Sequence, residues 1–106
     1  MIRSLNDGDV KLSPSYQSIL QLHVRLLEAE IPHEILRIMD GWKLAYPDQD
    51  SCIFDVVEHC GSYGHEADLM EAYGYGIDDV AGYVHIDEAF KMFEKVHEER
   101  GNENKR

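Results

Sequence analysis

The sequence predicts an α+β fold: a three-stranded antiparallel meander preceded by one helix and followed by two helices, in the order α-β-β-β-α-α. Apolar residues recur at helical spacing in the first third of the chain. An Asp-Gly pair then separates two short apolar runs, which is typical of a β-hairpin. A capped apolar stripe near the carboxyl end indicates a final helix. Together these segments favour an antiparallel sheet with one face covered by helices.

The first helix is expected over about residues 14–30, after an irregular lead-in at residues 1–12. Ser13-Pro14 has the pattern of an N-cap followed by proline at the first helical position, where a missing N–H costs nothing. Pro32 then ends the helix. The residues at helical spacing are Tyr16, Ile19, Leu20, His23, Leu26 and Leu27.

The next segment predicts a β-hairpin closed by Asp40-Gly41. This pair is preferred in a two-residue type I′ turn, because both central residues need positive φ. Closing the turn there places Met39 opposite Trp42 on a largely apolar face. In the same register, Arg37 lies opposite Leu44 and Ile35 opposite Tyr46.

The third strand and the last two helices follow from composition. Cys52 to Glu58 is rich in β-favouring residues and is expected as the third strand. Glu66 to Tyr73 is expected as a short helix ended by glycine, and residues 77–85 are ambiguous. Asp87 is expected to cap the last helix. The stripe of that helix is Ala89, Phe90, Phe93 and Val96. The single domain is expected to span residues 13–100, with a polar tail at 101–106.

The charge of the chain is concentrated in one segment. The 106 residues include 21 acidic and 10 basic ones, which gives a net charge of −11. No lysine or arginine occurs between Lys43 and Lys91, and 11 of the acids lie there. The sequence contains no apolar run of membrane-spanning length, no secretion-signal pattern at its amino end and no disulfide framework.

A negative field of this kind repels nucleic acid and anionic lipid, and it attracts cationic partners. The acidic segment is either a solubilising surface or a face that docks on a basic protein surface, with divalent-ion binding as a third possibility. The docking hypothesis predicts carboxylates and exposed tyrosines as the binding groups. These residues are Asp48, Asp50, Tyr63, Glu66, Asp68, Tyr75, Asp78 and Asp79.

The run from Glu58 to Asp68 has the highest density of functional side chains. His59, Cys60 and His65 could supply zinc ligands, together with Glu66 or Cys52. Their spacing fits no zinc template. Adjacent strand residues point to opposite faces, so His59 and Cys60 would not hydrogen-bond to each other as a catalytic Cys-His pair. We therefore expect structural roles for these residues, with no metal and no cofactor. A small metal-binding or hydrolytic domain centred on His59, Cys60 and His65 is the alternative.

Several short motifs between residues 31 and 71 carry a resemblance to a known group. They are Asp40-Gly41-Trp42, Tyr46-Pro47, Glu58-His59, Gly61-Ser62-Tyr63-Gly64, Asp68-Leu69 and Glu71. With these motifs the chain resembles small uncharacterised proteins encoded by phages and prophages of Gram-positive bacteria. Where those proteins have serine or a similar small residue after the histidine, this chain has Cys60.

The resemblance implies an accessory role in the cytoplasm of an infected or lysogenic cell. Combined with the charge, it leads to the expectation of a small acidic accessory protein that is no enzyme and acts by protein–protein binding. One form of this hypothesis is an inhibitor that mimics the charge of nucleic acid and blocks a basic host surface. Such a protein binds neither nucleic acid nor membrane directly.

Overall fold

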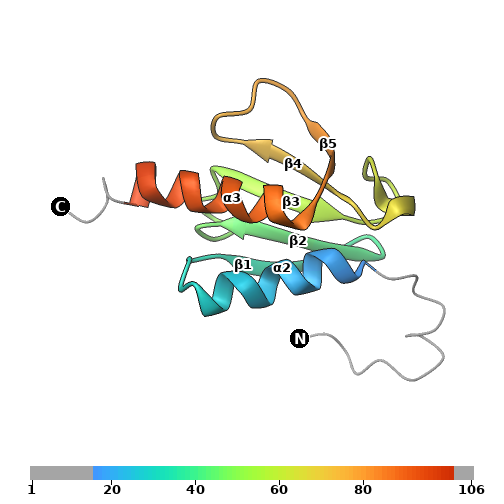
Figure 1. Cartoon of the computed structure of the whole chain (residues 1–106), viewed down its shortest axis with the longest axis horizontal. Coiled ribbons are helices and arrows are strands. Elements are labelled where there is room, and N and C mark those ends of the chain that lie inside the picture. Colours follow the sequence, from blue (N-terminus) through green and yellow to red (C-terminus); the bar gives the residue numbers. More distant parts are fainter. Residues whose placement is uncertain (1–15, 102–106) are drawn as a thin grey trace.

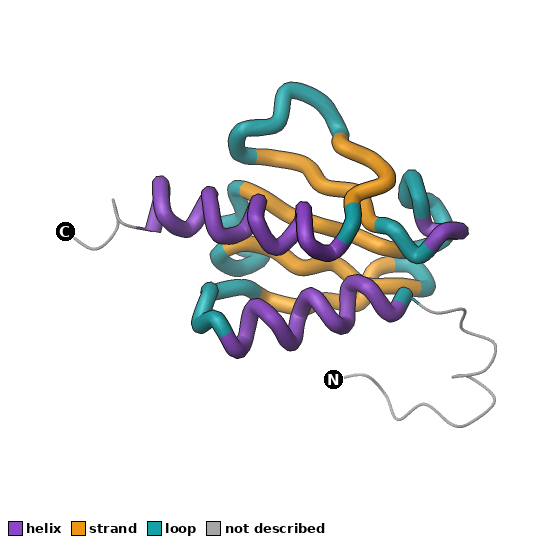
Figure 2. Tube along the Cα trace, viewed as in Figure 1, coloured by secondary structure: helices purple, strands orange, loops and turns teal. Residues whose placement is uncertain are grey.

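The computed structural model describes residues 16–101, which form a five-stranded antiparallel sheet and two α-helices (Figure 1). The strands follow one another across the sheet in chain order, and both helices lie on the same side of them (Figure 2). The elements are α2 (Gln17–Glu28), β1 (Glu34–Ile38), β2 (Gly41–Tyr46), β3 (Phe54–Glu58), the 3₁₀ turn η1 (His65–Ala67), β4 (Met70–Gly74), β5 (Ala81–Val84), α3 (Ile86–Val96) and the π-helical turn η2 (His97–Gly101).

The α+β class is confirmed, but the expected three-stranded meander followed by two helices is wrong. The segment expected as a helix from Glu66 to Tyr73 instead contains η1 and then β4. The 3₁₀ turn cannot continue, because Gly64 and Asp68 on either side of it have left-handed backbone, with φ of 98° and 59°. The ambiguous segment 77–85 contains β5.

The β1–β2 hairpin has a different register from the expected one. Its two turn residues are Met39 and Asp40, so Ile38 pairs with Gly41 and Arg37 with Trp42. Met39 has a φ of 56° and therefore occupies the left-handed position that was expected for glycine. Gly41 is required for another reason, since a Cβ at this position would lie 1.9 Å from the carbonyl oxygen of Glu58 on β3.

The helices begin at different caps from those expected. The N-cap of α2 is Tyr16; Ser13-Pro14, the lead-in at 1–12 and residues 102–106 lie outside the described residues. α3 is capped by His85 rather than by Asp87: the Asp87 N–H donates to His85 Nδ1, and the His85 N–H donates to Glu88 Oε1. Within residues 16–101, no helix is long and apolar enough to cross a membrane.

The core lies between the helices and the sheet face that they cover. Phe93 of α3 packs edge-on against Phe54 of β3, with ring centroids 5.0 Å apart. The other fully buried helix residues are Ile19, Leu22, Leu26, Ala89 and Val96. Leu44, Val56 and Ala72 are buried on this helix-covered face. Because strand side chains alternate between faces, the residues before and after each of them in the sequence point to the other side of the sheet. We call this second side the open face; it is formed by Glu34, Leu36, Lys43, Ala45, Asp55, Val57, Glu71 and Tyr73.

Candidate functional site

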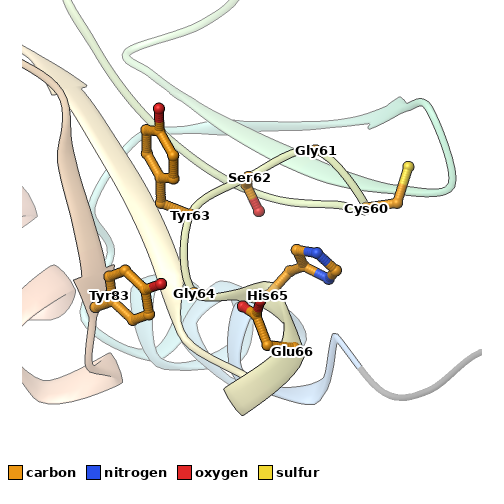
Figure 3. Close-up of a pocket in the computed structure, with 8 residues that line it drawn as sticks. All are labelled: Cys60, Gly61, Ser62, Tyr63, Gly64, His65, Glu66 and Tyr83. Atoms are coloured by element: carbon orange, nitrogen blue, oxygen red, sulfur yellow. The ribbon is translucent and has the colours of Figure 1, made fainter.

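The β3–β4 loop forms a pocket of about 200 Å³ beside β5 (Figure 3). The chain curls through Gly61 and Gly64, and β5 closes one side. Tyr63 packs on β5 because Gly82 has no side chain, since a Cβ there would lie 2.7 Å from the Cβ of Tyr63. The lining residues are Cys60, Gly61, Ser62, Tyr63, Gly64, His65, Glu66 and Tyr83.

Hydrogen bonds within the loop fix this shape. Ser62 Oγ accepts the His59 N–H at 3.0 Å and donates to the His59 carbonyl oxygen at 2.9 Å. His59 Nδ1 in turn accepts the Gly61 N–H at 2.9 Å. The Tyr63 N–H donates to Glu71 Oε1 on the open face at 2.8 Å. The loop is thus built from its own side chains, and His59 and Ser62 serve its structure.

The residues of the alternative site do not converge. The Cys60 thiol points away from the His65 ring (Figure 3), and His59 is bonded to Gly61. Among residues 16–101, no three histidine, cysteine, aspartate or glutamate side chains are placed to hold a metal ion. Asp40 beside the thiol raises the pKa of Cys60, which disfavours the thiolate that metal ligation or nucleophilic attack needs.

The carboxylates expected to bind a partner are divided between the two ends of the sheet. Asp48 and Asp50 lie in the β2–β3 turn, and Asp78 and Asp79 lie in the β4–β5 loop at the same end. These two segments touch, because the Tyr75 N–H donates to the carbonyl oxygen of residue 53 at 2.8 Å. All four aspartates are exposed.

The remaining expected residues have other surroundings. Glu66 is exposed at the opposite end of the sheet, in η1. Asp68 supports α2, because its Oδ1 accepts the Ser18 N–H at 3.3 Å and its carbonyl oxygen accepts the Ser18 hydroxyl at 2.7 Å. Tyr75 is half-buried, and its hydroxyl donates to Glu99 at 2.7 Å. Asp68 and Tyr75 therefore already have partners within the fold.

A buried carboxyl group lies behind the loop. Glu58 is fully buried on the helix-covered face, where its Oε1 accepts the Ile19 N–H at 3.2 Å. Burial and the neighbouring carboxylate of Asp68 raise the pKa of Glu58 to about 9. Glu58 is therefore protonated at neutral pH, and its Oε2, which has no other partner within residues 16–101, can donate to Asp68. Sequence reasoning missed this role, because a glutamate at the end of a strand usually faces water.

Three tyrosines are exposed on and beside the open face. Tyr63, Tyr73 and Tyr83 are 63%, 54% and 59% exposed. Tyr63 had been expected to be exposed, and it is. Tyr73, the last residue of the segment expected as a helix, instead lies on β4 and faces away from the helices. The alternation of Met70, Ala72 and Gly74 with Tyr73 is the signal that would have identified it.

Comparison of the chain with models of known families, with curated proteins and with solved structures finds no match.

Proposed function

We propose that this chain is a small acidic accessory protein that acts by binding a basic surface of another protein. The observation that carries the proposal is the electrostatic character of the stretch from β2 to the first turn of α3. This stretch, residues 44–90, contains 11 acidic residues and no lysine or arginine, and it presents three exposed tyrosines. Tyrosine and carboxylate groups together favour contact with a partner that carries arginine and lysine.

The four exposed aspartates at one end of the sheet support the same proposal. Asp48, Asp50, Asp78 and Asp79 come from two touching segments and form no ion pair within residues 16–101. Unpaired surface charges of one sign raise the association rate of an oppositely charged partner. A basic surface that normally holds nucleic acid is one such partner. The chain would then cover that surface and block nucleic acid binding, in the cytoplasm of a bacterial cell.

Affinity capture from a host extract, followed by measurement of the purified pair, tests the proposal. We define the end-neutralised variant as Asp48→Asn, Asp50→Asn, Asp78→Asn and Asp79→Asn, which keeps side-chain size and removes four charges. The native chain is expected to retain a basic protein that the variant retains less. The Kd of that pair should rise steeply with salt for the native chain and less for the variant. Equal capture by both chains, with a Kd independent of salt, would contradict the proposal.

A further inference from the structure

We propose that the open face holds an arginine side chain of the partner between the ring of Tyr73 and the carboxylate of Asp55. This inference rests on the proposed function and assigns the docking surface within it. The two residues lie directly opposite each other on β4 and β3. Side chains opposite each other in an antiparallel pair have Cβ atoms about 5 Å apart and point to the same face. Two adjacent strands therefore hold the ring and the carboxylate side by side.

Within the described part of the chain, the Asp55 carboxylate forms no ion pair. It is half-buried, and its hydrogen-bond partner within residues 16–101 is the Cys52 thiol, with Sγ 3.9 Å from Oδ2. Lys43 lies on the same face opposite Val57, and within residues 16–101 it forms no ion pair within 4 Å. Burial raises the pKa of Asp55, while the field of Lys43 lowers it. A cation placed against this carboxylate would stabilise its charged form, which burial disfavours.

The ring of Tyr73 is available for the same cation. Each arginine in residues 16–101 already lies over an aromatic ring of this chain: Arg25 over Phe90, Arg37 over Trp42 and Arg100 over Tyr75. None of them lies over Tyr73, which is more than half exposed. Within residues 16–101, the ring of Tyr73 is therefore free to accept the guanidinium of a partner.

Arginine fits this pair of groups better than lysine. Its planar guanidinium stacks on a ring and at the same time donates two hydrogen bonds to a carboxylate. The neighbouring Glu71 carboxylate adds negative potential, although one of its oxygens accepts the Tyr63 N–H. The occupant is thus an arginine-bearing segment of a basic protein, laid across β3 and β4.

Binding of labelled peptides to the full chain tests this assignment. The probe is a synthetic peptide of alternating arginine and glycine, and its lysine counterpart is the comparison. Tyr73→Leu and Asp55→Asn are each expected to weaken binding of the arginine peptide about three-fold, from the cost of one exposed cation–π contact or ion pair. Tyr73→Phe, which keeps the ring, should bind like the native chain. Glu94→Gln, which removes the same charge from an exposed position on α3, should change the Kd less than two-fold.

Each other outcome overturns a defined part of the proposal. If the double variant Tyr73→Leu, Asp55→Asn binds as tightly as the native chain while the end-neutralised variant does not, the docking surface is the sheet end, and only this inference fails. If the native chain does not bind the arginine peptide at all, the proposed function fails with it. If sedimentation shows a native dimer that Tyr73→Leu dissociates, the occupant is a second copy. Circular dichroism of each variant shows whether it is folded.

Discussion

The protonated Glu58 carboxyl group makes the stability of the fold depend on pH. Its folded-state pKa of about 9 lies above the usual 4.5. The unfolded chain therefore releases this proton as pH rises past 4.5, whereas the folded chain keeps it. The contribution of Glu58 is fully present below pH 4.5 and is lost progressively as pH rises toward 9.

Replacing Glu58 with glutamine should remove this pH dependence. Glutamine has the shape of the protonated side chain, so it can accept the Ile19 N–H and donate to Asp68. We expect Glu58→Gln to match the native chain at pH 4.5 and to be more stable at pH 8. The difference should grow by at most about 1.4 kcal/mol per pH unit between them. Urea unfolding at several pH values measures it, and a constant difference would show that Glu58 is ionised in the fold.

Gly41 gives a second prediction at this scale, and it separates two explanations for one glycine. If Gly41 were the second residue of a type I′ turn, asparagine would be tolerated, because asparagine accepts positive φ. The close approach to the Glu58 carbonyl instead excludes any Cβ. Gly41→Asn and Gly41→Ala should therefore both destabilise the fold by about 3 kcal/mol or more.

Gly61→Ala is the matched control for Gly41, because a Cβ at Gly61 would meet side chains rather than backbone, with the His59 ring at 3.3 Å and the Met39 methyl group at 3.8 Å. Thermal unfolding of the three variants should show a large loss of Tm at position 41 and a small one at position 61. A Gly41→Asn variant as stable as the native chain would restore the turn explanation.

At the scale of elements, Asp40 connects three parts of the fold. It lies in the β1–β2 turn, its Oδ2 accepts the Tyr16 hydroxyl from the start of α2 at 2.7 Å, and its Oδ1 accepts the Cys60 N–H of the β3–β4 loop at 2.8 Å. Burial alone would raise the pKa of Asp40, but these hydrogen bonds lower it below its usual 3.8. The charged form of Asp40 therefore stabilises the fold above pH 3.8, and this contribution is lost as pH falls below that value.

Asp40→Ala should lower the free energy of unfolding at pH 7 by about 2 kcal/mol, because it leaves two donors without their charged acceptor. Tyr16→Phe removes one of the two bonds and should cost about half as much. At pH 3 both losses should shrink. Hydrogen exchange should also show faster opening of the Cys60 amide in Asp40→Ala than in Tyr16→Phe. An Asp40→Ala variant of native stability would show that the turn holds neither α2 nor the loop.

Helices and strands could be predicted where the pattern of apolar residues and turn residues within the segment itself identifies them. The first and last helices were expected from apolar spacing, and the strands ending at Tyr46 and Glu58 were expected from the Asp-Gly pair and from composition; the structure contains all four. β4 was missed because the first residues after Gly64 do form a helical turn, and only the left-handed Asp68 ends it. β5 has just four residues, with a positive φ at Tyr83 and a register shift opposite β4, so alternation is weak there.

The candidate site was less predictable than the fold, because it depends on which strands become neighbours. Tyr73 and Asp55 are 18 positions apart in the sequence and meet only through the β3–β4 pairing. The helix expected over 66–73 did not predict that Tyr73 would lie beside Asp55. The segregation of charge, in contrast, is visible in the sequence itself.

At the scale of the whole molecule, the acidic segment must lower stability through repulsion between its own charges. The repulsion is largest where exposed carboxylates come together without cations, as at the sheet end with Asp48, Asp50, Asp78 and Asp79. Sodium chloride screens charges over roughly 10 Å at 0.1 M and over roughly 3 Å at 1 M. Moderate salt should therefore raise the Tm of the native chain slightly.

The end-neutralised variant shows whether this gain comes from charge. It should have a higher Tm than the native chain in low salt, and its Tm should rise less when salt is added, because four of the repelling charges are gone. Since asparagine still accepts hydrogen bonds, the Ser51 N–H at Asp48 and the Val80 N–H at Asp79 keep their acceptors. Scanning calorimetry at two salt concentrations measures both chains. An equal gain in Tm for the two would mean that salt acts through hydration of the protein surface, and that the sheet end stores no repulsion for a basic partner to relieve.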